Sequence, residues 1–293
     1  MKRIGIVGYG SIGKFLAESI LNKKQAGLPF ELAFVWNRSA DKLEDGTLPP
    51  QYRMSGELEA GFRSYVTEHQ NEPGLGVDML VEVAHPDIVH QFGPLFLEHC
   101  DLFVSSSTAL ANEVTAANLL RAAAADRGNH GIYVPTGAGW GVADIVKLDA
   151  LGNLRALKIT MQFNARALRL KEPLRSKLEA YLASPEATDP LVLHDGHIRE
   201  LAALAPNNVN TMICLALAGK SVGLDNAVGC LIAHKHHDAH IVDIEVTGPD
   251  GFHVATRRYN PAKNGAVTGS QTYGSFLMSL LQAGGKGSGL HFC

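Results

Sequence analysis

The sequence predicts an α/β protein with two domains, an N-terminal doubly wound parallel sheet and a second α+β domain. Three observations lead to this prediction. Short apolar runs alternate with helical patterns over residues 1–147, the first run enters a glycine-rich turn, and strand-like stretches with some alternation replace that order afterwards. We expect the second domain over residues 148–265. A C-terminal helix returning to the first domain, followed by a tail, is expected over residues 266–293.

The first strand and helix flank a G-x-G-x-x-G pattern. Gly8 permits a turn with positive φ, Gly10 leaves room for a pyrophosphate against the backbone, and Gly13 lets the helix lie close to the strand. The helical pattern over residues 15–21 directs its free N–H groups towards the phosphates. An ordinary glycine turn is the alternative, but the strand and helix on either side favour a Rossmann-type dinucleotide site. The expected contacts in this turn are Gly8, Gly10, Ser11, Ile12 and Gly13.

The second strand, residues 30–36, ends at a position that indicates which dinucleotide binds. An NAD-selective domain usually carries Asp or Glu there, because the carboxylate accepts hydrogen bonds from the ribose 2′-hydroxyl. This chain has Asn37 and Arg38 instead, which suit a 2′-phosphate, although a plain polar turn is the alternative. We therefore expect NADP or NAD as the cofactor, with NADP slightly favoured.

Three further strands complete the first sheet, over residues 77–84, 102–104 and 131–134. The first of them is almost continuously apolar, as a buried parallel strand should be. Ligands of such sheets bind beyond the carboxyl ends of the strands. We therefore expect Ala84 and His85 to contact the cofactor.

Helices are expected over residues 87–99 and 109–125, between these strands. The hydroxyl-rich segment 105–108 is expected to cap the second of these helices, and a contact with the cofactor is the alternative. Another glycine-rich turn, residues 135–141, precedes the next helix. Both glycine-rich turns of the domain therefore lie at the ligand-binding edge of the sheet.

The second domain is expected to have an antiparallel or mixed sheet. Its helical run covers residues 210–218, residues 181–190 are expected to form a surface loop, and the last helix is expected over residues 275–282. The glycine-rich residues 284–289 are expected to be a loose tail. The expected strands cover residues 154–163, 191–194, 228–233 and 241–246.

Composition excludes several classes of protein. With 46% apolar and 19% charged residues the chain is typical of a soluble globular enzyme, and a net charge of −3 makes no case for binding nucleic acid or a membrane surface. Its apolar runs are too short to span a bilayer. The four cysteines are scattered, without C-x-x-C spacing, and are expected to be reduced and mostly buried. We expect a cytoplasmic protein.

Two polar stretches of the second domain are candidates for chemistry. The first, residues 205–211, holds three asparagines directly before an apolar helix. Amide side chains both donate and accept hydrogen bonds, so they suit a nicotinamide carboxamide or a substrate carboxylate. Helix capping by asparagine is the alternative.

The second stretch, residues 233–240, contains four histidines between two strands. Their spacing fits no standard zinc site and no cysteine accompanies them, so we expect no metal. A solvated basic loop is one alternative, and a histidine acting as general acid–base is the other. His240 is the best candidate because the following strand anchors it. Asp238 either orients it or is simply exposed.

At these residues the chain resembles the L-aspartate dehydrogenase family, and within it the animal aspartate dehydrogenase domain-containing proteins. The resemblance extends over nearly the whole chain and is more specific than the glycine motif alone. The matching segments are residues 7–13, 34–38, 81–86, 205–211 and 238–243. The resemblance implies an NAD(P)-dependent oxidoreductase acting on CH–NH2 groups. The implied reaction is reversible oxidative deamination of L-aspartate to oxaloacetate and ammonia through iminosuccinate.

The resemblance also implies roles for particular residues. The family's N-x-H segment, which supplies the catalytic histidine, matches here with Asp238 in place of Asn and places that histidine at His240. Its P-x-N-x-N segment implies a cofactor contact at Asn208 or Asn210, and its small-residue loop implies another at Ala138. The family further suggests a homodimer built on the second domain's sheet.

The chain also departs from the bacterial members, which typically have Asp-Pro at residues 234–235 and a different run around residues 139–140. Two other functions remain open: a different NAD(P)-dependent imine or keto-acid reductase of the same form, and a non-catalytic NADP(H)-binding sensor. Four cations are candidates for the substrate carboxylates, a surface charge being the alternative for each. They are Arg166, Arg169, Lys171 and Arg257.

Overall fold

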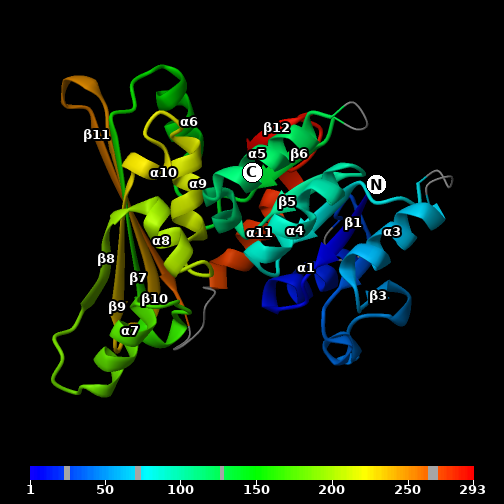
Figure 1. Cartoon of the computed structure of the whole chain (residues 1–293), viewed down its shortest axis with the longest axis horizontal. Coiled ribbons are helices and arrows are strands. Elements are labelled where there is room, and N and C mark those ends of the chain that lie inside the picture. The colour runs from blue at the N-terminus through cyan, green and yellow to red at the C-terminus, as the bar shows by residue number, and fades with distance from the viewer. Residues whose placement is uncertain (23–26, 70–73, 126–128, 263–269) are drawn as a thin grey trace.

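A computed structural model of the chain describes residues 1–22, 27–69, 74–125, 129–262 and 270–293. Two sheets lie side by side, each with its own helices (Figure 1). The N-terminal sheet has seven parallel strands in the order β12-β6-β5-β4-β1-β2-β3, and the second sheet has five in the order β11-β10-β7-β9-β8. The predicted Rossmann-type sheet followed by an α+β domain is confirmed.

The first sheet is covered on both faces. Helices α1 and α11 share one core with it, and α3, α4 and α5 lie against the other face. Its strands are β1 (Lys2–Val7), β2 (Phe30–Trp36), β3 (Arg53–Met54), β4 (Met79–Glu82), β5 (Asp101–Val104), β6 (Gly131–Val134) and β12 (Gly289–Phe292). Its helices are α1 (Ser11–Leu21), α3 (Leu58–His69), α4 (Pro86–Leu97), α5 (Glu113–Ala123) and α11 (Ser270–Gln282).

The C-terminus is a strand, so the prediction of a loose tail is wrong. Strand β12 pairs in parallel with β6, and the backbone N–H of Cys293 donates to the carbonyl of Val134. Three glycines with positive φ, Gly284, Gly285 and Gly287, form the turn that brings the chain back after α11. The glycine-rich composition therefore encodes a reversal of direction, and the four residues Gly289–Phe292 complete an edge of the sheet.

The segment 105–108 does not cap α5, contrary to expectation. Asn112 is the N-cap, and its side chain accepts a hydrogen bond from the backbone N–H of Thr115. The hydroxyl of Ser106 donates instead to the carboxylate of Glu82. A short 3-10 helix, Ser107–Ala111, occupies the turn that the sequence pattern assigned to the longer helix.

The second sheet is mixed. β7 and β9 run parallel, and the other neighbours are antiparallel. Its strands are β7 (Ala156–Asn164), β8 (Leu191–His197), β9 (Val228–His234), β10 (Ala239–Thr247) and β11 (His253–Pro261). The helices of this domain are α6 (Val142–Ala150), α7 (Leu174–Ala183), α8 (Ile198–Leu204), α9 (Asn210–Ala218) and α10 (Gly223–Asn226).

One face of this sheet turns towards the first domain. Helices α6, α8, α9 and α10 lie on that face (Figure 1), and α9 is buried over most of its length between the sheet and the first domain. A single core contains buried residues of both domains, and α6 crosses the predicted boundary at residues 147–148. α11 packs on α1, where the rings of Phe15 and Tyr273 lie 5.4 Å apart. The carboxyl ends of the first sheet therefore face the second domain across a shared core.

In the part of the chain that the structure describes, no helix has the length and apolar character needed to cross a membrane. All four cysteines are buried as free thiols, as expected, and burial raises the pKa of Cys293 to about 12.

Candidate active site

The glycines of the turn after β1 are of two kinds: some are required by the packing of the protein itself, and one has open space beside it that a ligand could fill. Gly8 has φ +113°, and a Cβ there would meet the carbonyl of Val83 at 2.8 Å. A Cβ on Gly13 would lie 2.0 Å from the carbonyl oxygen of Gly8. Gly10 differs, because a Cβ there would meet nothing within 4 Å. The protein's own packing therefore does not demand a glycine at this position, and the open space beside it fits a pyrophosphate approaching the backbone.

The start of α1 faces the same space. Gly10 is its N-cap and provides no side-chain hydrogen bond, and no acidic residue stands in the first turn. The first N–H groups of a helix lack intrahelical partners and attract anions. Ser11, Ile12 and Gly13 are thus placed as the sequence predicts for phosphate binding.

A groove of about 530 Å³ extends from this turn along the ends of β1, β2 and β4. Six predicted cofactor residues line it: Gly8, Gly10, Asn37, Arg38, Ala84 and His85. Asn37 is held by its amide, which donates to the carbonyl of Ser39 at 2.9 Å. Lys42 also lines the groove. It was not predicted as a cofactor contact, because it lies in a short 3-10 helix that carries no motif. Arg38 and Lys42 give this end of the groove a positive charge.

A buried carboxylate holds the floor of the groove in place. Glu82 accepts hydrogen bonds from the backbone N–H groups of Ala84 and His85 at 2.8 and 2.9 Å. It also accepts from the backbone and hydroxyl of Ser106 at 3.0 and 2.9 Å. Burial raises the pKa of Glu82 from 4.5 to about 6, against the opposing effect of these hydrogen bonds. One side chain thus ties together the loops that follow β4 and β5.

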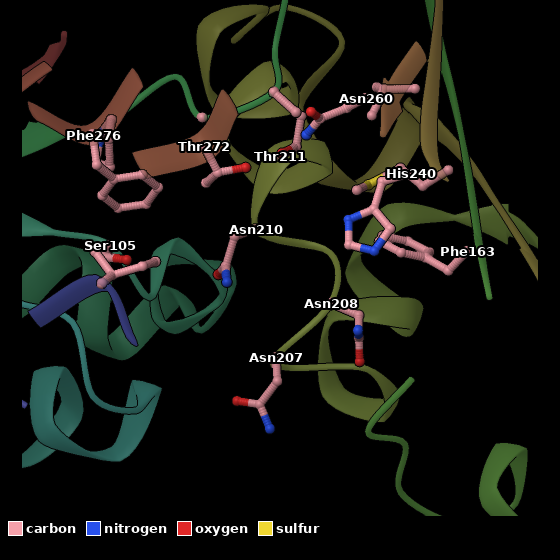
Figure 2. A pocket seen from close by; sticks show the side chains of 16 residues that line it. Ser105, Phe163, Asn207, Asn208, Asn210, Thr211, His240, Asn260, Thr272 and Phe276 are labelled. Carbon is pink, nitrogen blue, oxygen red and sulfur yellow. The ribbon is translucent and has the colours of Figure 1, made fainter. Parts of the chain in front are cut away.

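A second cavity, of about 150 Å³, opens between the two domains (Figure 2). Five predicted residues line it: Ile12, Ala138, Asn208, Asn210 and His240. The structure therefore unites residues that are up to 228 positions apart (240 − 12) in one space. Five other polar residues line it as well: Ser105, Asn207, Thr211, Asn260 and Thr272. Asn260 and Thr272 lie in an edge strand and an amphipathic helix, where no motif distinguishes them.

His240 occupies a constrained position in this cavity. It is the second residue of β10, is 7% exposed, and meets the ring of Phe163 edge-on at 4.7 Å. In the β10–β11 register it stands opposite Asn260. Asp238 is exposed and accepts a hydrogen bond from the hydroxyl of Tyr259 at 2.9 Å. The strand therefore anchors His240 as expected, and Asp238 does not line the cavity.

Two other histidines of the 233–240 stretch, His234 and His237, have local partners. The ring of His234 bonds to Gln162 at 2.9 Å and stacks on His237 with centroids 4.6 Å apart. Burial lowers the pKa of His234. Among residues 1–22, 27–69, 74–125, 129–262 and 270–293 there is no group of three His, Cys, Asp or Glu side chains able to hold a metal ion.

The three asparagines before α9 divide into two roles. Asn208 accepts from the backbone N–H of Arg169 at 2.8 Å, and Asn210 accepts from that of Thr108 at 3.0 Å. These amides fix neighbouring loops while their residues line the cavity. Asn207 is exposed at the cavity. Its amide is therefore available to a ligand, although the sequence motif pointed to its two neighbours.

None of the four candidate cations lines the interdomain cavity. Arg257 pairs with Asp243, with Nε and Oδ1 2.6 Å apart, on the face of the sheet away from the first domain. Arg166, Arg169 and Lys171 are exposed. A carboxylate in the cavity needs another cation or neutral N–H donors.

Comparison with known proteins identifies the family. Residues 144–279 match the family described as "Aspartate dehydrogenase, C-terminal", and residues 8–135 match "Homoserine dehydrogenase, NAD binding domain". The chain is 42% identical over 292 residues to the aspartate dehydrogenase domain-containing protein of Danio rerio, across 99% of this chain and 98% of the relative. The chain belongs to the aspartate dehydrogenase family.

Two more distant relatives are also named as aspartate dehydrogenases. The L-aspartate dehydrogenase of Ralstonia pickettii is 28% identical over 283 residues, covering 96% of this chain and 97% of the relative. The crystal structure of aspartate dehydrogenase from Thermotoga maritima has the same fold, with a TM-score of 0.64 at 17% identity and 98% coverage of both chains. The predicted family is thus confirmed, and the chain is an oxidoreductase with a nicotinamide cofactor.

Proposed function

We propose that the protein is an NAD(P)-dependent L-aspartate dehydrogenase. The observation that carries this proposal is that the dinucleotide turn lines both spaces: Gly8 and Gly10 line the groove, and Ile12 lines the cavity that His240 also lines. L-Aspartate, oxidised cofactor and water are converted to oxaloacetate, ammonia and reduced cofactor through iminosuccinate. The cofactor supplies hydride acceptance from the substrate Cα.

The chain's own residues position the cofactor in this proposal. Gly8, Gly10, Ser11, Ile12 and Gly13 hold the pyrophosphate, and Ala84, His85, Ala138, Asn208 and Asn210 shape the path to the nicotinamide. In this proposal Asn37, Arg38 and Lys42, which line one end of the groove, hold a ribose 2′-phosphate, so NADP is slightly favoured over NAD. Guanidinium and ammonium groups are the usual partners of phosphate.

His240 acts as the general base in this proposal. An imidazole titrates near neutral pH, so it takes a proton from the substrate ammonium or from the water that attacks the imine. The ring of Phe163 packs against the imidazole of His240 and restricts its orientation, so the imidazole is held in the cavity lining. The second domain closes the cavity from the other side and limits access of bulk water.

Oxidation of NADPH and NADH with oxaloacetate and ammonia, followed by absorbance, tests the proposal. Oxidation that requires both substrates supports it and measures the cofactor preference. If other keto acids or imines react and oxaloacetate does not, the protein is a different reductase of this form. If the reduced cofactor binds tightly and nothing is turned over, the protein acts as an NADP(H) sensor.

We also propose a homodimer, supported by the outer face of the second sheet. A row of side chains crosses that face through adjacent strands in register: Val192, Ile232, Gln162, Ile241 and Tyr259. Val192 and Tyr259 are 45% and 54% exposed. Apart from Gln162 these side chains are apolar or aromatic, and a row of this kind that is exposed at both ends indicates an interaction surface. A cytoplasmic location remains a prediction from composition.

A further inference from the structure

Strand β11 presents a buried polar group that the fold leaves unused. Asn260 is 3% exposed, and its Oδ1 has no hydrogen-bond partner within the described ranges. It lines the interdomain cavity and stands opposite His240 in the β10–β11 register. Figure 2 shows both side chains extending into the same space from neighbouring strands. The buried carbonyl is thus aimed at the space where we place the substrate.

An unused buried acceptor requires an explanation. Leaving such a group without a partner destabilises the folded protein, so buried carbonyls are almost always paired. The cavity lining includes donors such as Thr211, yet none of the described residues donates to this oxygen. A ligand with an N–H group satisfies this acceptor, and an amino group next to the imidazole of His240 is such a ligand.

The same strand carries a cation close to the cavity. Arg258 stands two residues before Asn260 and opposite Val242 in the register, so it is on the same face of the sheet. Its side chain is partly buried, and its Nη1 donates to the carbonyl of Gly137 at 3.1 Å. Gly137 and Val242 both line the cavity. The guanidinium therefore contacts a residue of the cavity lining from just outside it.

Arg258 has no carboxylate partner among the residues that the structure describes. Burial lowers its pKa, and no neighbouring acid offsets that effect. A guanidinium has five N–H donors, and the one hydrogen bond to Gly137 leaves the others available. Arg257 is the contrast, because it points to the outer face and pairs with Asp243. Of these two adjacent arginines, only Arg258 has its charge unmatched.

We propose that β11 supplies the recognition of the amino acid. The Asn260 carbonyl accepts a hydrogen bond from the substrate's nitrogen, and the Arg258 guanidinium binds one of its carboxylates. An acceptor for the amino group and a cation for the carboxylate together match an anionic amino acid. The identity of the substrate as aspartate rests on the proposed function, whereas the placement of the two groups rests on the geometry of β11.

Three variants of the full-length protein test this assignment: Arg258→Gln, Asn260→Ala and the control Arg257→Gln. We expect Arg258→Gln to raise KM for oxaloacetate by about 10-fold or more, since the substitution removes charge-assisted hydrogen bonds to the carboxylate. We expect Asn260→Ala to raise KM for ammonia by about 10-fold. Arg257→Gln should change neither value, and the Kd for NADPH should stay within about two-fold for all three.

A stability measurement separates recognition from a structural role. Because removing an acceptor that has no partner among the described residues breaks no hydrogen bond within them, Asn260→Ala should not lower Tm, while KM for ammonia rises. A fall in Tm with an unchanged KM means that Asn260 serves packing, and it overturns the assignment of this residue. Unchanged KM for oxaloacetate in Arg258→Gln overturns the assignment of Arg258, and the proposed function survives both results.

Binding of succinate to the protein saturated with NADP+, measured by calorimetry, gives a readout without turnover. We expect succinate to bind the native protein and to bind Arg258→Gln at least about 10-fold more weakly. If the native protein turns over no aspartate but this dependence on Arg258 is seen, the proposed function fails and the carboxylate site stands. If succinate binds both proteins equally, or neither, the carboxylate site is wrong whether or not the enzyme is active.

Discussion

At the residue scale, position in the fold decides which of several similar side chains is useful. Four histidines occur between residues 233 and 240, yet His240 alone among them lines the interdomain cavity in the described structure. The first residues of β10 anchor it, whereas His234 is occupied by Gln162. A motif therefore identifies the segment, and the strand register identifies the residue.

Replacement of His240 tests its proposed role directly. We expect His240→Ala to lower kcat by about 100-fold or more, because a general base contributes roughly that much. The Kd for NADPH, measured by fluorescence titration, should be nearly unchanged, since the dinucleotide groove is built from other residues. Unchanged turnover removes His240 from the mechanism.

Replacement of Arg38 tests the reading of the 2′-phosphate. We expect Arg38→Ala to weaken NADPH binding by about 10-fold and NADH binding much less, because only the former has the extra charge. Parallel titrations with the two cofactors measure the ratio, and Arg63→Ala on the exposed face of α3 is a suitable control. Equal weakening of both cofactors means that Arg38 does not contact the 2′-phosphate.

Glu82 predicts how stability depends on pH. Its pKa is raised from 4.5 to about 6 in the folded protein, so the folded state binds its proton more tightly. The stabilisation by the protonated form is complete below the unfolded pKa and is lost as pH rises through about 6. This loss corresponds to roughly 2 kcal/mol. In Glu82→Gln, which cannot titrate, the loss should be absent.

Urea unfolding of both proteins across that pH range checks this expectation. The free energy of unfolding of Glu82→Gln should rise relative to that of the native protein by up to roughly 2 kcal/mol between about pH 4.5 and pH 7. The comparison cancels the titration of the remaining groups. A difference that stays constant with pH contradicts the raised pKa.

At the element scale, the glycines of one strand–turn–helix motif are required for different reasons. Gly8 and Gly13 are required by backbone contacts inside the protein, and Gly10 has open space above it. Strand β11 shows the same division by face, with Arg257 outside and Arg258 inside. Because successive side chains of a strand point to opposite faces, the two adjacent arginines lie on opposite faces of the sheet.

The pair Gly10→Ala and Gly13→Ala tests this division. Gly13→Ala should lower Tm strongly, because its Cβ would lie 2.0 Å from the carbonyl oxygen of Gly8. Gly10→Ala should fold with nearly native Tm and bind NADPH at least about 10-fold more weakly, since a methyl group would occupy the expected phosphate path. Thermal melts and titrations measure both. Native cofactor affinity in Gly10→Ala excludes a close approach of the pyrophosphate.

At the scale of the whole molecule, the two domains act together. The cofactor turn belongs to the first sheet and His240 to the second, and a shared core fixes one against the other. Helix α11 adds Thr272 and Phe276 to the same cavity after the chain has returned to the first domain. The cavity therefore depends on the complete chain.

The proposed homodimer gives the prediction at this scale. We expect sedimentation or light scattering to report twice the chain mass of 31.4 kDa. Tyr259→Asp should shift the mass towards that of the single chain, because a charge in the apolar row must be desolvated in the interface. Leu151→Asp, an exposed residue outside the sheet, is the control. A single-chain mass for the native protein contradicts the dimer.

The sequence by itself determined the glycine turn, the family and five of the seven strands of the first sheet, whereas β3, α3 and β12 were not predicted. The predicted features are local: period, turn chemistry and short motifs operate within a few residues. That is why the ends of β2 and α9 agree with expectation. It also explains the error at residues 284–289, where glycines that predict a loose chain form a turn before a strand.

Only the tertiary structure decided which distant residues meet. The pairing of β12 with β6, the position of Asn260 opposite His240, and the burial of Glu82 between two loops depend on sheet order and register. Register joins segments far apart in the chain, and no local pattern encodes it. The turn that binds the dinucleotide was therefore readable from the sequence, whereas the cavity beside it became visible only when the two sheets were brought together.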